Sequence, residues 1–129
     1  MAVYGLVESV SKTAGADLTA DRYRAVKNGA NDTVTLCTTP NGGLSIGPIG
    51  VLQQVEASGR AVAVGISGLS KLIAGDTVTV GKGLTVNSAA NAVHAGSGDV
   101  VFAIADEGAA DGEVFRARLV DPYLLVGLN

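Results

Sequence analysis

Apolar side chains recur at every second residue in several short stretches of this sequence. In DTVTLC, Val34 and Leu36 alternate with threonines, and in GRAVAVGIS the residues Val62, Val64 and Ile66 alternate with alanines. A period of two puts alternate side chains on opposite faces, as in a half-buried β-strand. The pattern therefore predicts antiparallel strands.

The same alternation recurs further along the chain, in DTVTV, GLTVN and EVFRARLV. The side chains predicted to face inward there are Val78 and Val80, Leu84 and Val86, and Phe115, Ala117 and Leu119. Arg116 and Arg118 are predicted to face outward. DVVFAIAD is apolar on both faces, which is typical of a strand in the centre of a sheet.

Glycine supplies 18 of the 129 residues, about twice its usual share. Glycines separate the predicted strands at Asn28-Gly29, Asn41-Gly42-Gly43, Ser58-Gly59, Gly75-Asp76, Gly81-Lys82-Gly83 and Asp111-Gly112. Such residues accept the positive φ angles that hairpin turns need. About eight short strands divided in this way predict an all-β fold, a compact antiparallel β-sandwich or barrel, in a single domain over residues 1–129.

Helical periodicity is nearly absent. Residues 16–26, ADLTADRYRAV, could hold a turn or two, with Thr19 as the N-cap before Asp21 and Arg22. We therefore expect at most one short helix, near residues 18–25.

A faint internal repeat links the two halves of the chain. IGVLQQVEASGRAVAV, residues 49–64, and FAIADEGAADGEVFRA, residues 102–117, both run from an apolar strand through a glycine turn to a second strand. Gly59 and Gly112 align about half a chain apart. We expect two similar hairpins, paired in one sheet.

Charge and composition argue against several classes of partner. The formal net charge is −3 and the nine basic residues are scattered, whereas nucleic acid needs clustered Lys and Arg. No apolar run has membrane-spanning length, and the start lacks a secretion signal, so we expect no membrane partner and synthesis in the cytoplasm. The single cysteine, Cys37, excludes an internal disulfide and is expected to be a core thiol.

The sequence offers weak candidates for chemistry. Gly81-Lys82-Gly83 is not a Walker A loop, because the upstream glycine and the closing Ser or Thr are missing and a strand-like LTVN follows. His94, the single histidine, lies in a small-residue stretch without a nucleophile motif. We expect no enzyme activity, cofactor or metal site.

A crowd of carboxylates in one predicted hairpin, Asp106, Glu107, Asp111 and Glu113, is most simply a solvated turn. A calcium site there or at Asn31-Asp32 stays open, although the spacing matches no known ligand loop. An enzyme would have to use these acids or His94.

Both ends of the chain carry large apolar residues that are candidates for contact with a neighbouring protein. We expect extended arms at residues 1–14 and 122–129. The candidates are Val3, Tyr4, Leu6 and Val7 near the start, and Tyr123, Leu124, Leu125, Val126 and Leu128 near the end. Such an end either adds a strand to its own sheet or docks on a neighbour, and folding inward is an equal alternative.

The order of motifs resembles a known family. The motifs are GADLTADRYRAVKNGANDTVTL, then PIGVLQQVEASGRAVAVGISGLSKLIAGDTVTVGKGLTVNSAANAV, then VVFAIADEGAADGEVFRARLV. Together, over about Gly15 to Val120, they resemble the capsid cement, or decoration, proteins of tailed bacteriophages. Residues 102–105 depart from the family pattern, which more often has a glycine there, and YLLVGLN runs past its usual end.

The resemblance implies a virion protein on the capsid exterior, commonly a homotrimer at three-fold or quasi-three-fold positions. Its partner would be the major capsid protein, whose neighbouring subunits it would bridge to stabilise the shell against internal DNA pressure. The alternative is a fibre-like or adhesin-like surface module that recognises host glycans. Its candidate loops would be NSAANAVHAGSGD and residues 38–43.

Overall fold

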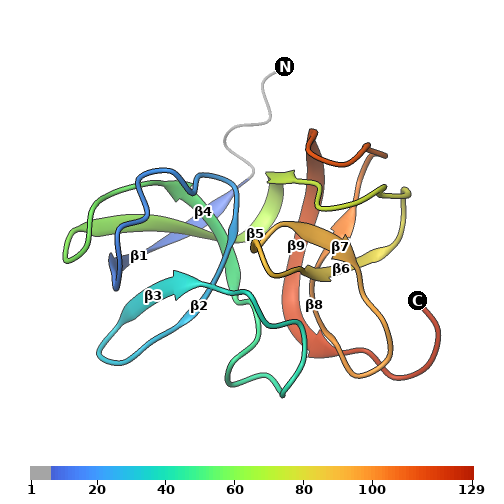
Figure 1. Cartoon of the computed structure of the whole chain (residues 1–129), viewed down its shortest axis with the longest axis horizontal. Helices are drawn as coiled ribbons and strands as arrows, with labels where there is room; N and C mark the ends of the chain where they lie inside the picture. The colour runs from blue at the N-terminus through green and yellow to red at the C-terminus, as the bar shows by residue number, and fades with distance from the viewer. Residues whose placement is uncertain (1–6) are drawn as a thin grey trace.

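A computed structural model describes residues 7–129, which form nine β-strands and no helix, so the all-β prediction is confirmed. Figure 1 shows two lobes side by side. The strands are β1 (Glu8–Ala14), β2 (Ala25–Asn28), β3 (Thr33–Leu36), β4 (Gly50–Gln54), β5 (Ala61–Ile73), β6 (Gly83–Val86), β7 (Ala92–His94), β8 (Val100–Ala105) and β9 (Val114–Leu124).

The first lobe is a closed ring of five strands in the order β1-β3-β2-β4-β5. The ring closes because β5 pairs with β4 on one side and with β1 on the other. Four of these pairings are antiparallel, and β1–β3 is parallel, with Thr13 opposite Thr33. A closed ring leaves no free sheet edge, which fits a chain with few charged residues to protect one.

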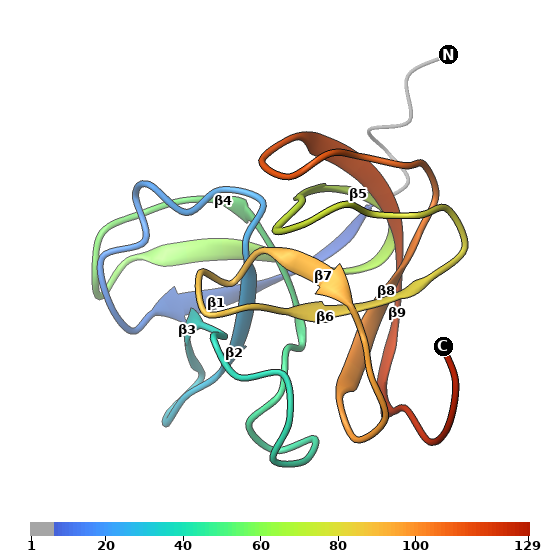
Figure 2. The same cartoon turned by 45° about the vertical axis from the view of Figure 1, so that its right-hand side comes forward.

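The second lobe reuses β5, whose second half pairs with β9, and continues β9-β8-β6-β7. A parallel bridge between Ala74 and Ala92 brings β7 back to the end of β5. The 13-residue strand β5 therefore belongs to both lobes (Figures 1 and 2). Gly68, with φ of 91°, lies where the strand passes from one lobe to the other.

The two lobes are built on the same plan. Ala14 N–H donates to the carbonyl of Arg60 at 2.8 Å in the first lobe, and Ala74 N–H donates to that of Glu113 at 2.8 Å in the second. Gly59 and Gly112 in turn donate to Ala14 and Ala74. The faint repeat in the sequence thus marks two hairpins, β4–β5 and β8–β9, each completing its own lobe, and β5 pairs with β9.

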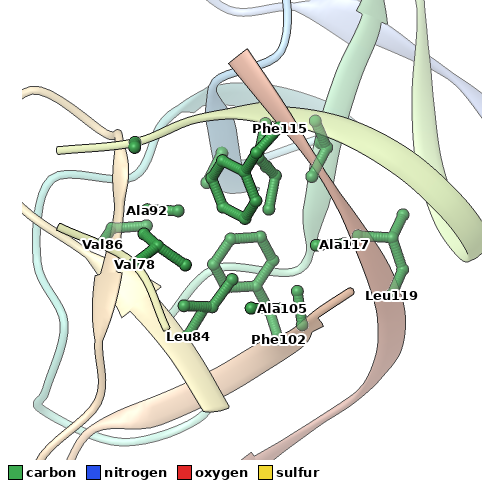
Figure 3. Packing of buried hydrophobic residues seen from close by; sticks show 14 of the residues in the cluster. Val78, Leu84, Val86, Ala92, Phe102, Ala105, Phe115, Ala117 and Leu119 are labelled. Atoms are coloured by element: carbon green, nitrogen blue, oxygen red, sulfur yellow. The ribbon is translucent and has the colours of Figure 1, made fainter. Parts of the chain in front are cut away.

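Two hydrophobic clusters fill the lobes. Figure 3 shows the rings of Phe102 and Phe115 near each other at the centre of the second cluster. This cluster also takes in Ala25 and Val51 of the first lobe, so the apolar packing crosses the boundary between lobes. The first cluster consists of Ala14, Leu18, Val26, Val34, Leu52, Val62 and Val64.

Most inward and outward assignments are confirmed. Phe115, Ala117 and Leu119 are buried, and Arg118 is exposed. The prediction of a strand over DTVTV is wrong: the segment makes a single bridge, between Val78 and Ala109, and Val80 is exposed. Val78 is nevertheless buried, because its side chain packs in the cluster of the second lobe.

No helix forms over residues 18–25. Thr19 is not an N-cap, because its N–H and hydroxyl both donate to Asp17 Oδ1, at 3.1 and 2.8 Å. Tyr23 then takes φ of 68°, a left-handed conformation that a helix cannot continue through.

Candidate interaction surface

The residues considered for catalysis make local hydrogen bonds with the backbone and with Arg116. His94 lies at the end of β7, and its Nε2 accepts a hydrogen bond from the N–H of Thr79 at 2.9 Å. Over residues 7–129, no group of three or more His, Cys, Asp and Glu side chains could hold a metal ion. In the same part of the chain, no helix has the length and apolar character to cross a membrane.

The acidic hairpin uses its carboxylates locally. Asp106 accepts a hydrogen bond from Arg116 Nε at 2.9 Å, and Glu107 Oε1 accepts from Arg116 N–H, also at 2.9 Å. Glu113 Oε1 accepts from Ala110 N–H at 2.7 Å. These bonds hold the β8–β9 turn in shape.

Cys37 is fully buried, as expected. Its thiol donates to the carbonyls of Thr39 and Ile46, at 3.4 and 3.6 Å. Burial raises the pKa of the thiol, more than the Thr39 hydrogen bond and nearby Lys27 lower it. A buried thiol held neutral in this way is suited to packing.

The apolar residues near the start are placed only in part. Val3, Tyr4 and Leu6 lie outside the described residues. Val7 is half-buried beside a groove between the lobes. Of the arm expected at residues 1–14, Glu8–Ala14 forms β1 and lies within the first ring.

The apolar residues near the end divide into two groups. Tyr123 and Leu124 complete β9, where they pair with Val101 and Val100 of β8. Their side chains nevertheless remain exposed. Beyond β9, Val126 and Leu128 are 88% and 98% exposed, and Leu125 is half-buried.

This terminal segment is held by hydrogen bonds at both ends. Leu125 N–H donates to Asp99 and its carbonyl accepts from Gly98, at 2.9 and 2.8 Å. The Asn129 side chain bonds both the N–H and the carbonyl of Gly83, each at 2.8 Å, and the carbonyl of Ala95 at 3.0 Å. The segment is therefore a fixed loop that presents Val126 and Leu128 to solvent.

Lys82, in the Gly81-Lys82-Gly83 turn, also contributes to this anchor. Its ammonium group donates to the Asn129 carbonyl at 3.1 Å. Gly81 has φ of 85°, as a turn residue should, and β6 follows directly. The turn fixes the terminal loop.

A second apolar loop, missed in the sequence, lies at the same end of the molecule. Leu44 and Ile46 are exposed in the loop after β3. This loop reaches β8, because the Pro40 carbonyl accepts from Val100 N–H at 2.8 Å and a Cβ on Gly47 would lie 2.7 Å from the Val100 side chain. Val100 is the residue that pairs with Leu124.

We call the exposed side chains of these two loops and the end of β9 the apolar edge: Leu44, Ile46, Leu124, Val126 and Leu128. Both loops lie along the lower side of the molecule in Figure 1. Exposed apolar side chains gathered in this way typically mark a contact with another protein. The signal in the sequence was the run LSIGPI among glycines, which is too rich in turn residues to read as a strand.

Comparison with solved structures found a protein of similar fold, whereas comparison of sequences found no relative. No protein-family model matches the chain. No curated protein matches it either. Among solved structures, it is similar to the N base of the head fiber gp8.5 of bacteriophage phi29, with a TM-score of 0.63 and 24% identity over 88% of this chain and 95% of that one. The chain therefore has the fold of that base.

Proposed function

We propose that this protein is a structural component of a bacteriophage head, bound to the outside of the shell through contacts with the major capsid protein. The observation that carries the proposal is the likeness to the phi29 head fiber base, which extends over nearly the whole of both chains. The resemblance of the motif order to cement proteins points to the same location by an independent route. The protein would be made in the host cytoplasm and would act in the virion.

The apolar edge supplies the surface for this attachment. Fixing a loop before it binds lowers the conformational entropy lost on association. The Asn129 bonds and the pairing of Leu124 with Val100 provide such fixation. Many copies on one shell would each add a weak contact to the stability of the lattice.

A second candidate role is favoured by the nature of the structural neighbour. The neighbour is the base of a head fiber, so the chain is also suited to anchor a fibre-like or adhesin-like surface module. A cement protein stabilises the shell, whereas an anchor need only hold on to it. Either role is structural and needs neither enzyme activity nor a cofactor.

Heads of the encoding phage, prepared with and without the protein, separate these roles. We expect the protein on the outer surface in cryo-EM maps, as a trimer at three-fold or quasi-three-fold positions. A higher temperature of DNA release in its presence would indicate cement, and an unchanged temperature with surface density would indicate an anchor. Absence from the surface would contradict both.

A further inference from the structure

A groove of about 790 Å³ lies between the lobes, away from the apolar edge. Both lobes line it, since it takes residues from β1, β4, β5, β9 and the loop that precedes β2. Grooves between lobes are frequent positions for small-molecule sites. This volume exceeds what a single simple anion needs and is large enough for a short saccharide.

Cationic side chains gather in this groove, although the chain is acidic overall. Arg22, Lys71 and Arg116 line it, with Glu107 as the carboxylate among the lining residues. Asp106 neutralises Arg116 at 2.9 Å. Over residues 7–129, no carboxylate lies within ion-pair distance of Arg22 or Lys71.

The Tyr23 ring contacts both Arg22 and Lys71. The Arg22 guanidinium lies 4.9 Å from the centre of the Tyr23 ring, and the Lys71 ammonium group lies 5.8 Å from it. Arg22 Nε also donates to the Gln53 carbonyl at 3.1 Å. The cations are thus positioned by a ring and a backbone acceptor, and their remaining N–H groups are free to bind an anion.

The backbone of Tyr23 is strained at this point. Its N–H donates to Leu52, as Gly81 N–H donates to Ala105 in the second lobe, so the two residues are equivalent. Both residues have a positive φ. The second lobe has a glycine there, which tolerates this angle, whereas the first lobe has a tyrosine. Strained non-glycine residues tend to persist where their side chains serve a site.

Polar groups suited to hydroxyl recognition complete the groove. Gln53 Nε2 donates to Oγ of the buried Ser70 at 2.7 Å and to the Val51 carbonyl at 3.3 Å, which orients the amide and leaves its Oε1 as an acceptor. The exposed Ser9 lies on the neighbouring strand β1. Amide and hydroxyl groups both donate and accept, which matches the paired donor and acceptor character of sugar hydroxyls. An anion carrying several hydroxyls fits this lining better than an apolar ligand does.

We propose that the groove binds an anionic saccharide, a single sugar or short sugar chain that carries a carboxylate or phosphate group. Arg22 and Lys71 contact the anion, and Gln53 Oε1 and the Ser9 hydroxyl contact the sugar hydroxyls. The groove reaches Val114, at the start of β9, whereas the apolar edge includes Leu124, at its end. Ten residues of strand, a length of roughly 33 Å along the chain, lie between the two, and no residue of the apolar edge lines the groove.

Titration of the isolated, isotope-labelled protein followed by NMR tests this site independently of any phage head. The probes are galacturonic acid trimer, glucose 6-phosphate, neutral galactose trimer and inorganic phosphate. We expect amide shifts at Tyr23, Lys71 and Arg116 with one or both of the anionic sugars, with a Kd of about 1 mM or tighter. The responsive sugar identifies carboxylate or phosphate as the preferred group.

Variants test whether binding of the anionic sugar depends on the cationic side chains. Lys71→Ala should weaken binding about tenfold, since a charge-assisted hydrogen bond is lost. Lys71→Arg should retain binding. Arg60→Ala, which removes an exposed charge outside the groove, should bind as the wild type does.

Three results would overturn the proposal. The first is no shift with either anionic sugar. The second is an equal response to one of the two control probes. Equal binding of neutral galactose trimer would show that the anion is not required, and equal binding of inorganic phosphate would show that the sugar is not required. The third is binding that survives Arg22→Ala and Lys71→Ala together.

Discussion

Tyr23 and Gly81 occupy the same position in the two lobes, and both have positive φ, 68° and 85°. Gly81 adopts this angle freely, whereas a residue with a Cβ loses about 1–2 kcal/mol there. The chain retains the tyrosine where its ring packs against the core and lies beside Arg22 and Lys71.

This strain predicts an order of stability among variants at residue 23. Tyr23→Gly and Tyr23→Ala lose similar packing, but the glycine variant is relieved of strain and should be the more stable by about 1 kcal/mol in urea unfolding. In the second lobe, Gly81→Ala should destabilise by about 1 kcal/mol. A Cβ there would meet no atom within 4 Å, so backbone strain alone is measured. Equal stability of the two Tyr23 variants would contradict the assignment.

The cluster that crosses between the lobes predicts that they unfold together. Phe115→Ala in the second lobe should cost about 3–5 kcal/mol and Leu52→Ala in the first about 2–5 kcal/mol. Because Ala25 and Val51 pack in the same cluster as Phe115, calorimetry should show one transition that both variants shift. Two separate transitions, each moved by one variant, would show independent lobes.

The alternation of side chains made the strands predictable. Val34 and Phe115 are buried, as the alternation predicts. The prediction succeeds because which face of a strand a side chain lies on depends only on its position in the local sequence. Val80 shows the limit of the pattern. It continues the alternation of DTVTV, yet no strand among residues 7–129 pairs with it, because pairing depends on residues far away in the sequence.

The arrangement of strands was beyond the local pattern. Closure of the first ring requires Thr13 to pair with Thr33 and β5 to serve two lobes, and neither residue type nor spacing specifies this. The faint repeat around Gly59 and Gly112 did reflect the shared plan. The groove was missed because it joins Arg22, Lys71 and Arg116 from three separate segments.

The anchor of the terminal loop predicts a local effect of Asn129→Ala. Losing the two bonds to Gly83 and the one to Ala95 should cost about 1–2 kcal/mol. Hydrogen exchange at the Gly83 amide should accelerate about tenfold or more, since its acceptor is removed. Ser97→Ala is the control, because Ser97 accepts one long bond of 3.4 Å from the same loop. Unchanged exchange at Gly83 would show that the loop is not held by Asn129.

The Cys37 thiol predicts a pH-dependent reactivity. Burial raises its pKa above the ordinary value of 9.0, so the thiol should resist alkylation in the native protein at mildly alkaline pH. Because the fold favours the neutral thiol, Cys37 stabilises the folded state below its ordinary pKa. This contribution to the free energy of unfolding is lost as the pH rises through the higher pKa of the folded state. Fast labelling by iodoacetamide without unfolding would contradict the burial.

We propose that this protein attaches to a phage head through the apolar edge. Co-sedimentation of the purified protein with heads that lack it tests this most directly. The wild type should sediment with the heads, and Val126→Asp combined with Leu128→Asp should weaken binding at least about tenfold. Both side chains are almost fully exposed, so the fold should be unaffected. Val80→Asp, an exposed apolar residue at the other end of β8, should bind as the wild type does. A wild type that stays in the supernatant, or a double variant that sediments equally well, would contradict the claim.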